Sequence, residues 1–143
     1  MFFGEYEHSI DDKSRLTLPA RFRDALAGGV VLARGLERQI DVYPREGWQV
    51  TVESRLSELD PLSREARDLR RFFYAGMADC EPDKQGRVLV PPPLARHASL
   101  EKDVLIAGVY DHLEIWDRAA WAAHLHAVEG SADDVAERLA EKR

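Results

Sequence analysis

The sequence has only one cysteine, Cys80, among its 143 residues. A single thiol can form neither an internal disulfide nor a zinc site built from cysteines, so we expect Cys80 to be a small apolar residue of a strand. Two of the five histidines, His124 and His126, are close in sequence but would point to opposite sides of a helix. We therefore predict no metal ion and no cofactor.

Long apolar runs and the motifs of enzymes are missing as well. No stretch approaches the roughly 20 apolar residues that cross a membrane, and no basic-then-apolar leader follows Met1, so we expect a cytoplasmic protein. We find no glycine-rich phosphate loop and no nucleophile with a companion base at motif spacing. The 26 acidic residues are scattered, as on a solvated surface. We predict that the protein is not an enzyme and takes no small-molecule substrate.

One segment of the chain occurs twice. Residues 11–19 (DDKSRLTLP) return as residues 83–91 (DKQGRVLVP), and the match continues beyond both copies. Leu32, Gly35, Ile40, Arg45 and Trp48 correspond to Leu105, Gly108, Leu113, Arg118 and Trp121. The protein is a tandem repeat in which about forty residues are used twice.

Each copy predicts the same local structure. An Asp followed four residues later by an Arg, with Ser14 or Gly86 just before the Arg, is typical of a tight turn. Alternating apolar residues then predict a short strand, which Pro19 or Pro91 ends at the start of a short helix. Two hairpins should follow, at 30–43 and 104–116. Because neither unit can bury a core alone, we expect the two to pack on, or interleave with, each other about a pseudo-twofold axis as an α+β fold.

Helices should follow each hairpin. Trp48, Val52 and Leu56 form one apolar stripe, and a second helix should begin at Asp60 as N-cap and Pro61 as first residue, ending near Gly76. After the second copy we expect a helix through Trp121, and a last short helix through Leu139. These helices would flank the strands.

The doubled Asp-x-x-x-Arg, with its apolar-x-apolar-Pro, resembles the swapped-hairpin (SpoVT-AbrB) motif of AbrB-type DNA-binding proteins. Two copies in one chain resemble the MraZ family of bacterial transcriptional regulators, over nearly the whole chain. The resemblance implies a double-psi-like β-barrel flanked by helices, with repeats at 1–76 and 77–143 that pack as one unit. It further implies a nucleoid-associated repressor that binds short direct repeats of double-stranded DNA in the promoter of its own division and cell-wall operon. Rings of identical subunits are implied as well.

Basic residues are concentrated in the first copy, although the net charge is −6. Residues 13–23 hold four bases and no acid, whereas residues 85–95 hold only Arg87. A turn arginine alone would most often make a local bridge to its Asp, but the resemblance favours DNA contact by Arg15. We expect Arg15 and Lys13 to contact DNA first, then Arg21 and Arg23 through phosphates, and Arg87 last. Asp11 and Asp83 would orient the loops.

Two other functions stay open. A scaffold ring without DNA recognition would use the apolar helices and would not need the basic segment 13–23. An antitoxin-type DNA binder could use the same barrel, although the doubled motif and the lack of a long disordered toxin-binding tail count against it. Neither the operator nor the subunit number can be predicted from the sequence.

Overall fold

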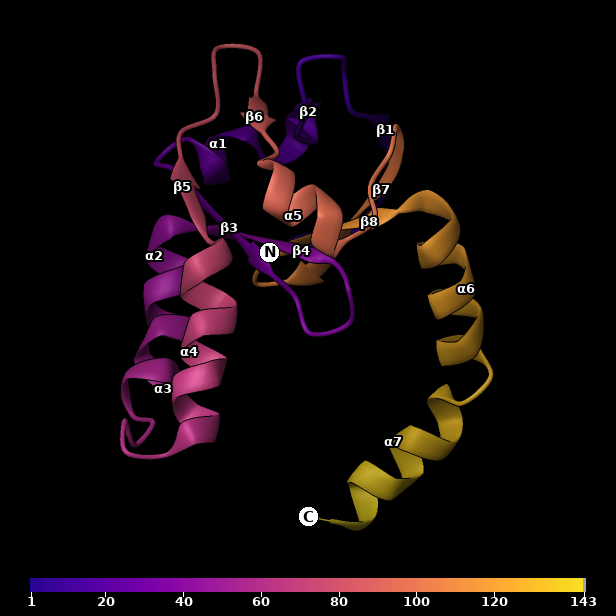
Figure 1. Ribbon diagram of the computed structural model, residues 1–143. Coiled ribbons are helices and arrows are strands. Elements are labelled where there is room, and N and C mark those ends of the chain that lie inside the picture. Colours follow the sequence, from indigo (N-terminus) through magenta and orange to yellow (C-terminus); the bar gives the residue numbers. More distant parts are fainter. Residues whose placement is uncertain (143) are drawn as a thin grey trace.

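A computed structural model describes residues 1–142 as two antiparallel sheets flanked by helices (Figure 1). The larger sheet has six strands, and two further strands, one from each repeat, form a separate ribbon. In spatial order the sheet is β1 (Phe2–Ser9), β7 (Asp103–Tyr110), β8 (Leu113–Asp117), β4 (Ile40–Pro44), β3 (Val30–Arg34) and β5 (Ala78–Cys80). The ribbon consists of β2 (Arg15–Thr17) and β6 (Arg87–Leu89).

The two repeats exchange their first strands. Strand β1 of the first repeat pairs with β7 of the second, and β5 of the second pairs with β3 of the first. The hairpins β3–β4 and β7–β8 meet through the pairing of β4 with β8. The repeats therefore interleave, which is one of the two arrangements that the small size of each unit allowed.

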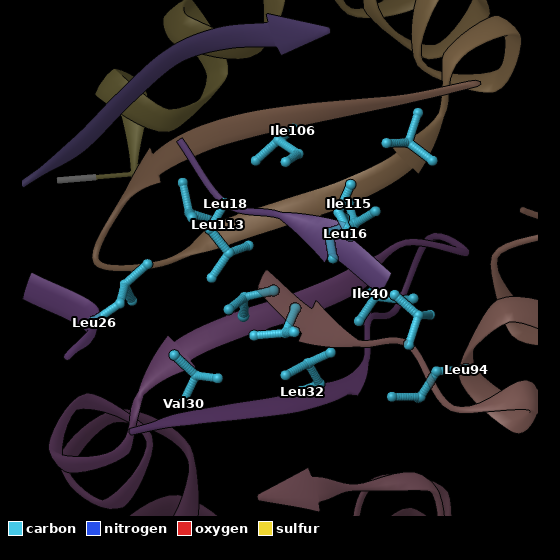
Figure 2. Packing of buried hydrophobic residues seen from close by; sticks show 14 of the residues in the cluster. Leu16, Leu18, Leu26, Val30, Leu32, Ile40, Leu94, Ile106, Leu113 and Ile115 are labelled. Carbon is cyan, nitrogen blue, oxygen red and sulfur yellow. The ribbon is translucent and has the colours of Figure 1, made fainter. Parts of the chain in front are cut away.

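A pseudo-twofold axis relates the repeats, and equivalent residues of the two repeats pair with each other at two points. Asp41 lies directly opposite its counterpart Glu114 in the β4–β8 pair, and Leu16 lies opposite Val88 in the ribbon. Ribbon and sheet share one apolar core, and Figure 2 shows Leu16 packed near Ile115 and Ile40. Burying each such side chain contributes about 1.5–3 kcal/mol to folding. Because the core draws on both repeats, neither half is buried without the other.

The strands do not close into the barrel that the family resemblance implied. Within residues 1–142, β1 and β5 are the two edges of an open sheet, and the ribbon has no hydrogen-bonded strand pairing to that sheet. Each ribbon strand is three residues long. One residue separates each strand from a proline: Leu18 precedes Pro19, and Val90 precedes Pro91. A proline has no N–H to extend a ladder, so pairing ends before the ribbon can join the sheet.

Short helices follow the ribbon strands, and longer ones follow the hairpins. The first group is η1 (Ala20–Phe22), α1 (Arg23–Leu26) and α5 (Pro92–His97). After the first hairpin come α2 (Arg45–Trp48), the π-helical η2 (Gln49–Glu53), α3 (Ser54–Ser57) and α4 (Arg64–Gly76). After the second come α6 (Arg118–Glu129) and α7 (Ala132–Glu141). As predicted, Trp48 and Leu56 are buried on one stripe.

The predicted start of α4 is wrong. Asp60 accepts a hydrogen bond from the amide of Leu62 at 3.0 Å and forms a turn, instead of capping the helix. The helix begins three residues later, because the Ser63 hydroxyl accepts from the amide of Ala66 at 3.3 Å. Both Asp60 and Ser63 are good capping residues, and the turn at 60–63 uses the first of them.

Helices α6 and α7 are largely exposed, although Trp121 and His124 of α6 pack on Trp116 of β8. Neither contains a buried residue, and Figure 1 shows them extending beyond the sheet on the side opposite the β1–β2 and β5–β6 loops. Val128, Val135 and Leu139 are exposed on these two helices. The single chain therefore leaves apolar side chains of α6 and α7 in water.

Candidate nucleic-acid interface

The loop between β1 and β2 is built around the carboxylate of Asp11. One oxygen accepts hydrogen bonds from the amides of Lys13 (2.9 Å) and Arg15 (2.8 Å), and the other accepts from Arg15 Nε at 2.8 Å. Ser14 has a positive φ of 61° and donates its amide to the Asp11 carbonyl at 3.0 Å. The Asp therefore fixes both the backbone of the turn and the direction of the Arg15 side chain.

The loop between β5 and β6 repeats this geometry. Asp83 accepts from the amides of Gln85 and Arg87, both at 2.9 Å, and from Arg87 Nε at 2.7 Å. Gly86 takes the left-handed position with a φ of 75°. The same spacing of Asp and Arg thus produces the same hydrogen-bond set in both repeats.

Each loop is fastened to the other repeat. The amide of Val90 donates to the carbonyl of Ser14 at 2.8 Å, and the amide of Leu18 donates to the carbonyl of Gly86 at 2.9 Å. These two bonds extend the pairing of β2 with β6. Both loops consequently project from the same end of the molecule, at the top of Figure 1.

The side chains of Arg15 and Arg87 are held by their own loops. The Arg15 side chain is 32% exposed, and the Arg87 side chain is 28% exposed. Within residues 1–142, the terminal guanidinium nitrogens of both have no hydrogen-bond partner. The local Asp–Arg bridge is therefore present in both repeats, and each bridge leaves two donating nitrogens for another molecule.

Charge on Asp11 and Asp83 is favoured by this geometry. The backbone amide of Arg15, with the Arg15 guanidinium and the Lys13 amide, holds the pKa of Asp11 below its ordinary value. The backbone amide of Arg87 and the corresponding groups do the same for the pKa of Asp83. Both carboxylates are thus ionised at neutral pH and offset part of the charge of their arginines.

The other three predicted bases lie around the first loop in different settings. Lys13 is exposed at the turn. Arg21, on η1, places its guanidinium carbon 4.4 Å from the ring centre of Phe3, a cation–π contact. Arg23, at the start of α1, donates from Nη2 to the carbonyl of Gln85 at 3.2 Å and so contacts the second loop. Arg21 and Arg23 therefore contact different segments of the chain.

Sequence reasoning missed the contacts between repeats at this end of the molecule. The bonds from Val90 and Leu18 use backbone groups, which leave no residue-type signal in the sequence. The contact of Arg23 with Gln85 joins segments far apart in the chain, so only the β2–β6 pairing reveals it. These contacts fasten the two loops to each other.

Two interleaved β units, each with an Asp–Arg loop at the same end, define a single-chain α+β protein of two tandem repeats. A family model described as the MraZ protein, antitoxin-like, matches this chain twice, at residues 1–72 and 73–143. The transcriptional regulator MraZ of Heliobacterium modesticaldum is 45% identical over 139 residues, covering 97% of this chain and 96% of its own. The transcriptional regulator MraZ of Roseiflexus castenholzii is 46% identical over 143 residues, covering 100% of this chain and 99% of its own.

The chain therefore belongs to the MraZ family of transcriptional regulators. Kinship over its whole length makes it a transcriptional regulator, a function that implies DNA binding. The family consists of regulators and not of enzymes, which confirms the prediction that this chain is not an enzyme. Among residues 1–142, none of the helices is long and apolar enough to cross a membrane.

Proposed function

We propose that this regulator recognises double-stranded DNA through the surface formed by its two Asp–Arg loops. The observation that carries the proposal is the joining of both loops at one end of the molecule, fastened by the amides of Val90 and Leu18. A rigid pair of turns can enter a groove of DNA with little loss of conformational freedom on binding. A net charge of −6 makes a local basic surface more important than overall charge.

Arg15 is the proposed base-reading residue, with Lys13 beside it. The terminal nitrogens of Arg15 can donate to the O6 and N7 of a guanine, a contact worth about 1–3 kcal/mol of discrimination. Its bridge to Asp11 is partly exposed, and such bridges contribute only about 0–1 kcal/mol, so DNA can compete for the guanidinium. Asp11 and Asp83 orient the arginines through their own loops.

Arg21 and Arg23 are proposed to bind phosphates on either side of the first loop. Both are held near it, by Phe3 and by the Gln85 carbonyl respectively. Arg87 has the geometry of Arg15 but fewer basic neighbours, and we assign it a weaker contact of the same kind.

Self-assembly into a ring is the second part of the proposal. The exposed apolar side chains of α6 and α7 suit contact with another copy of the chain. A ring would present several loop surfaces to tandem DNA repeats, so that weak single contacts add through a high effective concentration. The consequence we propose is repression of its own division and cell-wall operon through direct repeats in the promoter. The proposed division of the chain is 1–76 and 77–143, packed as one unit.

The test is fluorescence anisotropy with DNA from upstream of the protein's own gene, over a series of salt concentrations. We expect wild type to bind, to weaken steeply with salt, and to bind several repeats far more tightly than one. Arg15→Ala should weaken binding by about 10-fold to 100-fold while oligomer mass stays unchanged. Arg87→Ala removes the same local bridge from the other repeat and should weaken binding by less than Arg15→Ala does.

Two outcomes would contradict the proposal. Equal affinity for one repeat and for several would remove the role assigned to the ring. If neither wild type nor Arg15→Ala binds while both form rings, the protein is a scaffold and the loops have only a structural role.

A further inference from the structure

The pseudo-twofold axis passes through a group of polar side chains that the DNA-binding proposal does not use. Asp41 and Glu114 occupy equivalent positions in the two repeats and lie directly opposite each other in the β4–β8 pair. Two residues before Asp41 lies Gln39, and two residues before Glu114 lies His112, so Gln39 and His112 are also equivalent positions of the two repeats. Like charges directly opposite in a sheet repel, so a cation between them would stabilise the pairing.

The donor atoms of this group lie close enough together to hold a metal ion. His112 Nε2 lies 3.4 Å from Asp41 Oδ1 and 3.6 Å from Glu114 Oε2. Within residues 1–142 the three residues form the one such group whose ligand atoms all lie within 4.8 Å of one another. These two separations exceed the usual hydrogen-bond distance of about 2.7–3.2 Å. Ligands at about 2.0–2.1 Å from a tetrahedral Zn²⁺ lie about 3.4 Å from one another, close to these two separations.

We propose that Asp41, His112 and Glu114 form a Zn²⁺ site that joins the two repeats at the axis. A nitrogen and two carboxylate oxygens are ligands that zinc accepts, and three protein ligands leave a fourth position for water. Mg²⁺ and Ca²⁺ fit poorly, because both prefer sites made of oxygen ligands, and Ca²⁺ takes six to eight of them. The site is independent of the proposed DNA surface.

A second group of side chains orients the three ligands. The Nδ1–H of His112 can donate to Asp111 Oδ1 at 2.8 Å, which aims the lone pair of Nε2 at the two carboxylates. Gln39 Nε2 donates to Asp41 Oδ1 at 3.2 Å and to Glu114 Oε2 at 3.1 Å. A carboxylate behind the ligating histidine and hydrogen bonds to the ligating carboxylates are regular features of metal sites.

Packing and access also suit a bound ion. The ring of Tyr43 stacks on His112 at 4.3 Å with an angle of 9°, and Trp116 Nε1 donates to Glu114 Oε1 at 3.0 Å. The ligand side chains are only 14–16% exposed, so the attraction between ion and carboxylates is little screened by water. Asp41 lines a groove of about 310 Å³ between the sheet and α2–α3, which gives an ion a path from solvent.

The test uses full-length protein freed of metal with a chelator and then dialysed against Zn²⁺. We expect one Zn²⁺ per chain by elemental analysis, uncompeted by excess Mg²⁺. His112→Gln gives the second repeat the residue that the first has at Gln39, and should weaken binding by at least about 100-fold. His124→Gln is the matched control on α6, where its ring stacks on Trp116, and should bind Zn²⁺ as wild type does.

A milder variant and a spectrum keep the proposal testable if His112→Gln does not fold. Asp111→Asn keeps all three ligands but weakens the orienting bond, and should reduce affinity by about 10-fold to 100-fold. X-ray absorption of the zinc-loaded wild type should show only nitrogen and oxygen ligands. Unchanged affinity in both His112→Gln and Asp111→Asn, or a sulfur ligand from Cys80, would overturn the proposal, and so would an absence of stoichiometric Zn²⁺.

Discussion

The two repeats have the same loop but different surroundings. The carboxylates of Asp11 and Asp83 make the same three hydrogen bonds, at distances that agree within about 0.1 Å. Around the first loop lie Lys13, Arg21 and Arg23, whereas the second repeat has Gln85, Pro93 and Ala95 at the corresponding positions. The comparison therefore separates the loop geometry, which both repeats share, from the basic side chains, which surround only the first loop.

The shared part of the loops has a physical cause. Each loop offers a carbonyl to the other repeat, so a changed turn in one copy would break a bond made by its partner. The basic side chains take no part in those backbone bonds and are free to differ. We expect the loop backbone to be required by the fold, and the proposed DNA contact to depend on the basic side chains of the first repeat.

The largest expected effect comes from the ribbon core. Leu16 and Val88 face each other across β2 and β6, and they are 0% and 3% exposed. Leu16→Ala should lower the free energy of unfolding by about 2–5 kcal/mol, because the cavity lies between both repeats. Val88→Ala removes fewer atoms and should cost about 1.5–2.5 kcal/mol.

Urea denaturation followed by tryptophan fluorescence, at one protein concentration, would measure both losses. Asp12, exposed beside the first loop, offers the control Asp12→Ala, with an effect near zero. A loss below 1 kcal/mol for Leu16→Ala would mean that the ribbon is not part of the shared core.

The next largest effect comes from swapping the residues at one equivalent position of the two loops, Lys13 and Gln85. Lys13 and Gln85 are equivalent, and the amide of each donates to the loop Asp at 2.9 Å. Lys13→Gln should keep the turn but lower the salt dependence of DNA binding by about one unit of slope, because one phosphate contact is lost. Gln85→Lys should raise the slope by a similar amount if the second loop also meets phosphate. Anisotropy over a salt series measures both, and equal slopes in all three proteins would remove Lys13 from the interface.

Much of the fold could be predicted because its signals are local. The turn, the alternating strand and the proline that ends it are encoded within residues 11–19 and again within 83–91. The small size of each unit predicted that the two would pack on or interleave with each other, and the pairings of β1 with β7 and β5 with β3 show that they interleave. Local signals also caused the error at Asp60, since the sequence contains two adequate caps within four residues.

The remainder depended on contacts between segments far apart in the chain. The resemblance implied a closed barrel, but closure depends on hydrogen bonds between ribbon and sheet, and three-residue strands followed by prolines do not form them. The grouping of Asp41 with His112 depends on the register of β4 against β8, which residue types alone do not encode. The DNA-contacting role of Arg15 remains a prediction, because its geometry is equally that of a local bridge.

A smaller effect should come from the left-handed residue of each loop. Gly86 has a φ of 75°, and a Cβ there would lie 2.7 Å from Arg23 Nε. Gly86→Ala should therefore destabilise the protein by about 1–2 kcal/mol and displace Arg23 from the Gln85 carbonyl. Ser14 already has a Cβ at a φ of 61°, so Ser14→Ala should change stability by less than about 0.5 kcal/mol. Equal losses in urea denaturation would contradict this asymmetry.

The smallest expected effect is a dependence of stability on acid that both loops share. The folded-state pKa values of Asp11 and Asp83 are lowered, chiefly by the backbone amides of Arg15 and Arg87. Each carboxylate thus adds stability that is fully present above the unfolded pKa of about 3.9 and is lost as pH falls through the lower folded pKa. Asp11→Asn and Asp83→Asn should be less stable than wild type at neutral pH, and the gap should close as pH falls through the lowered folded-state pKa of each carboxylate. Because the hydrogen-bond sets match, denaturation midpoints across pH should show equal gaps for both variants, and a gap in one alone would mean that the two loops are not equivalent in solution.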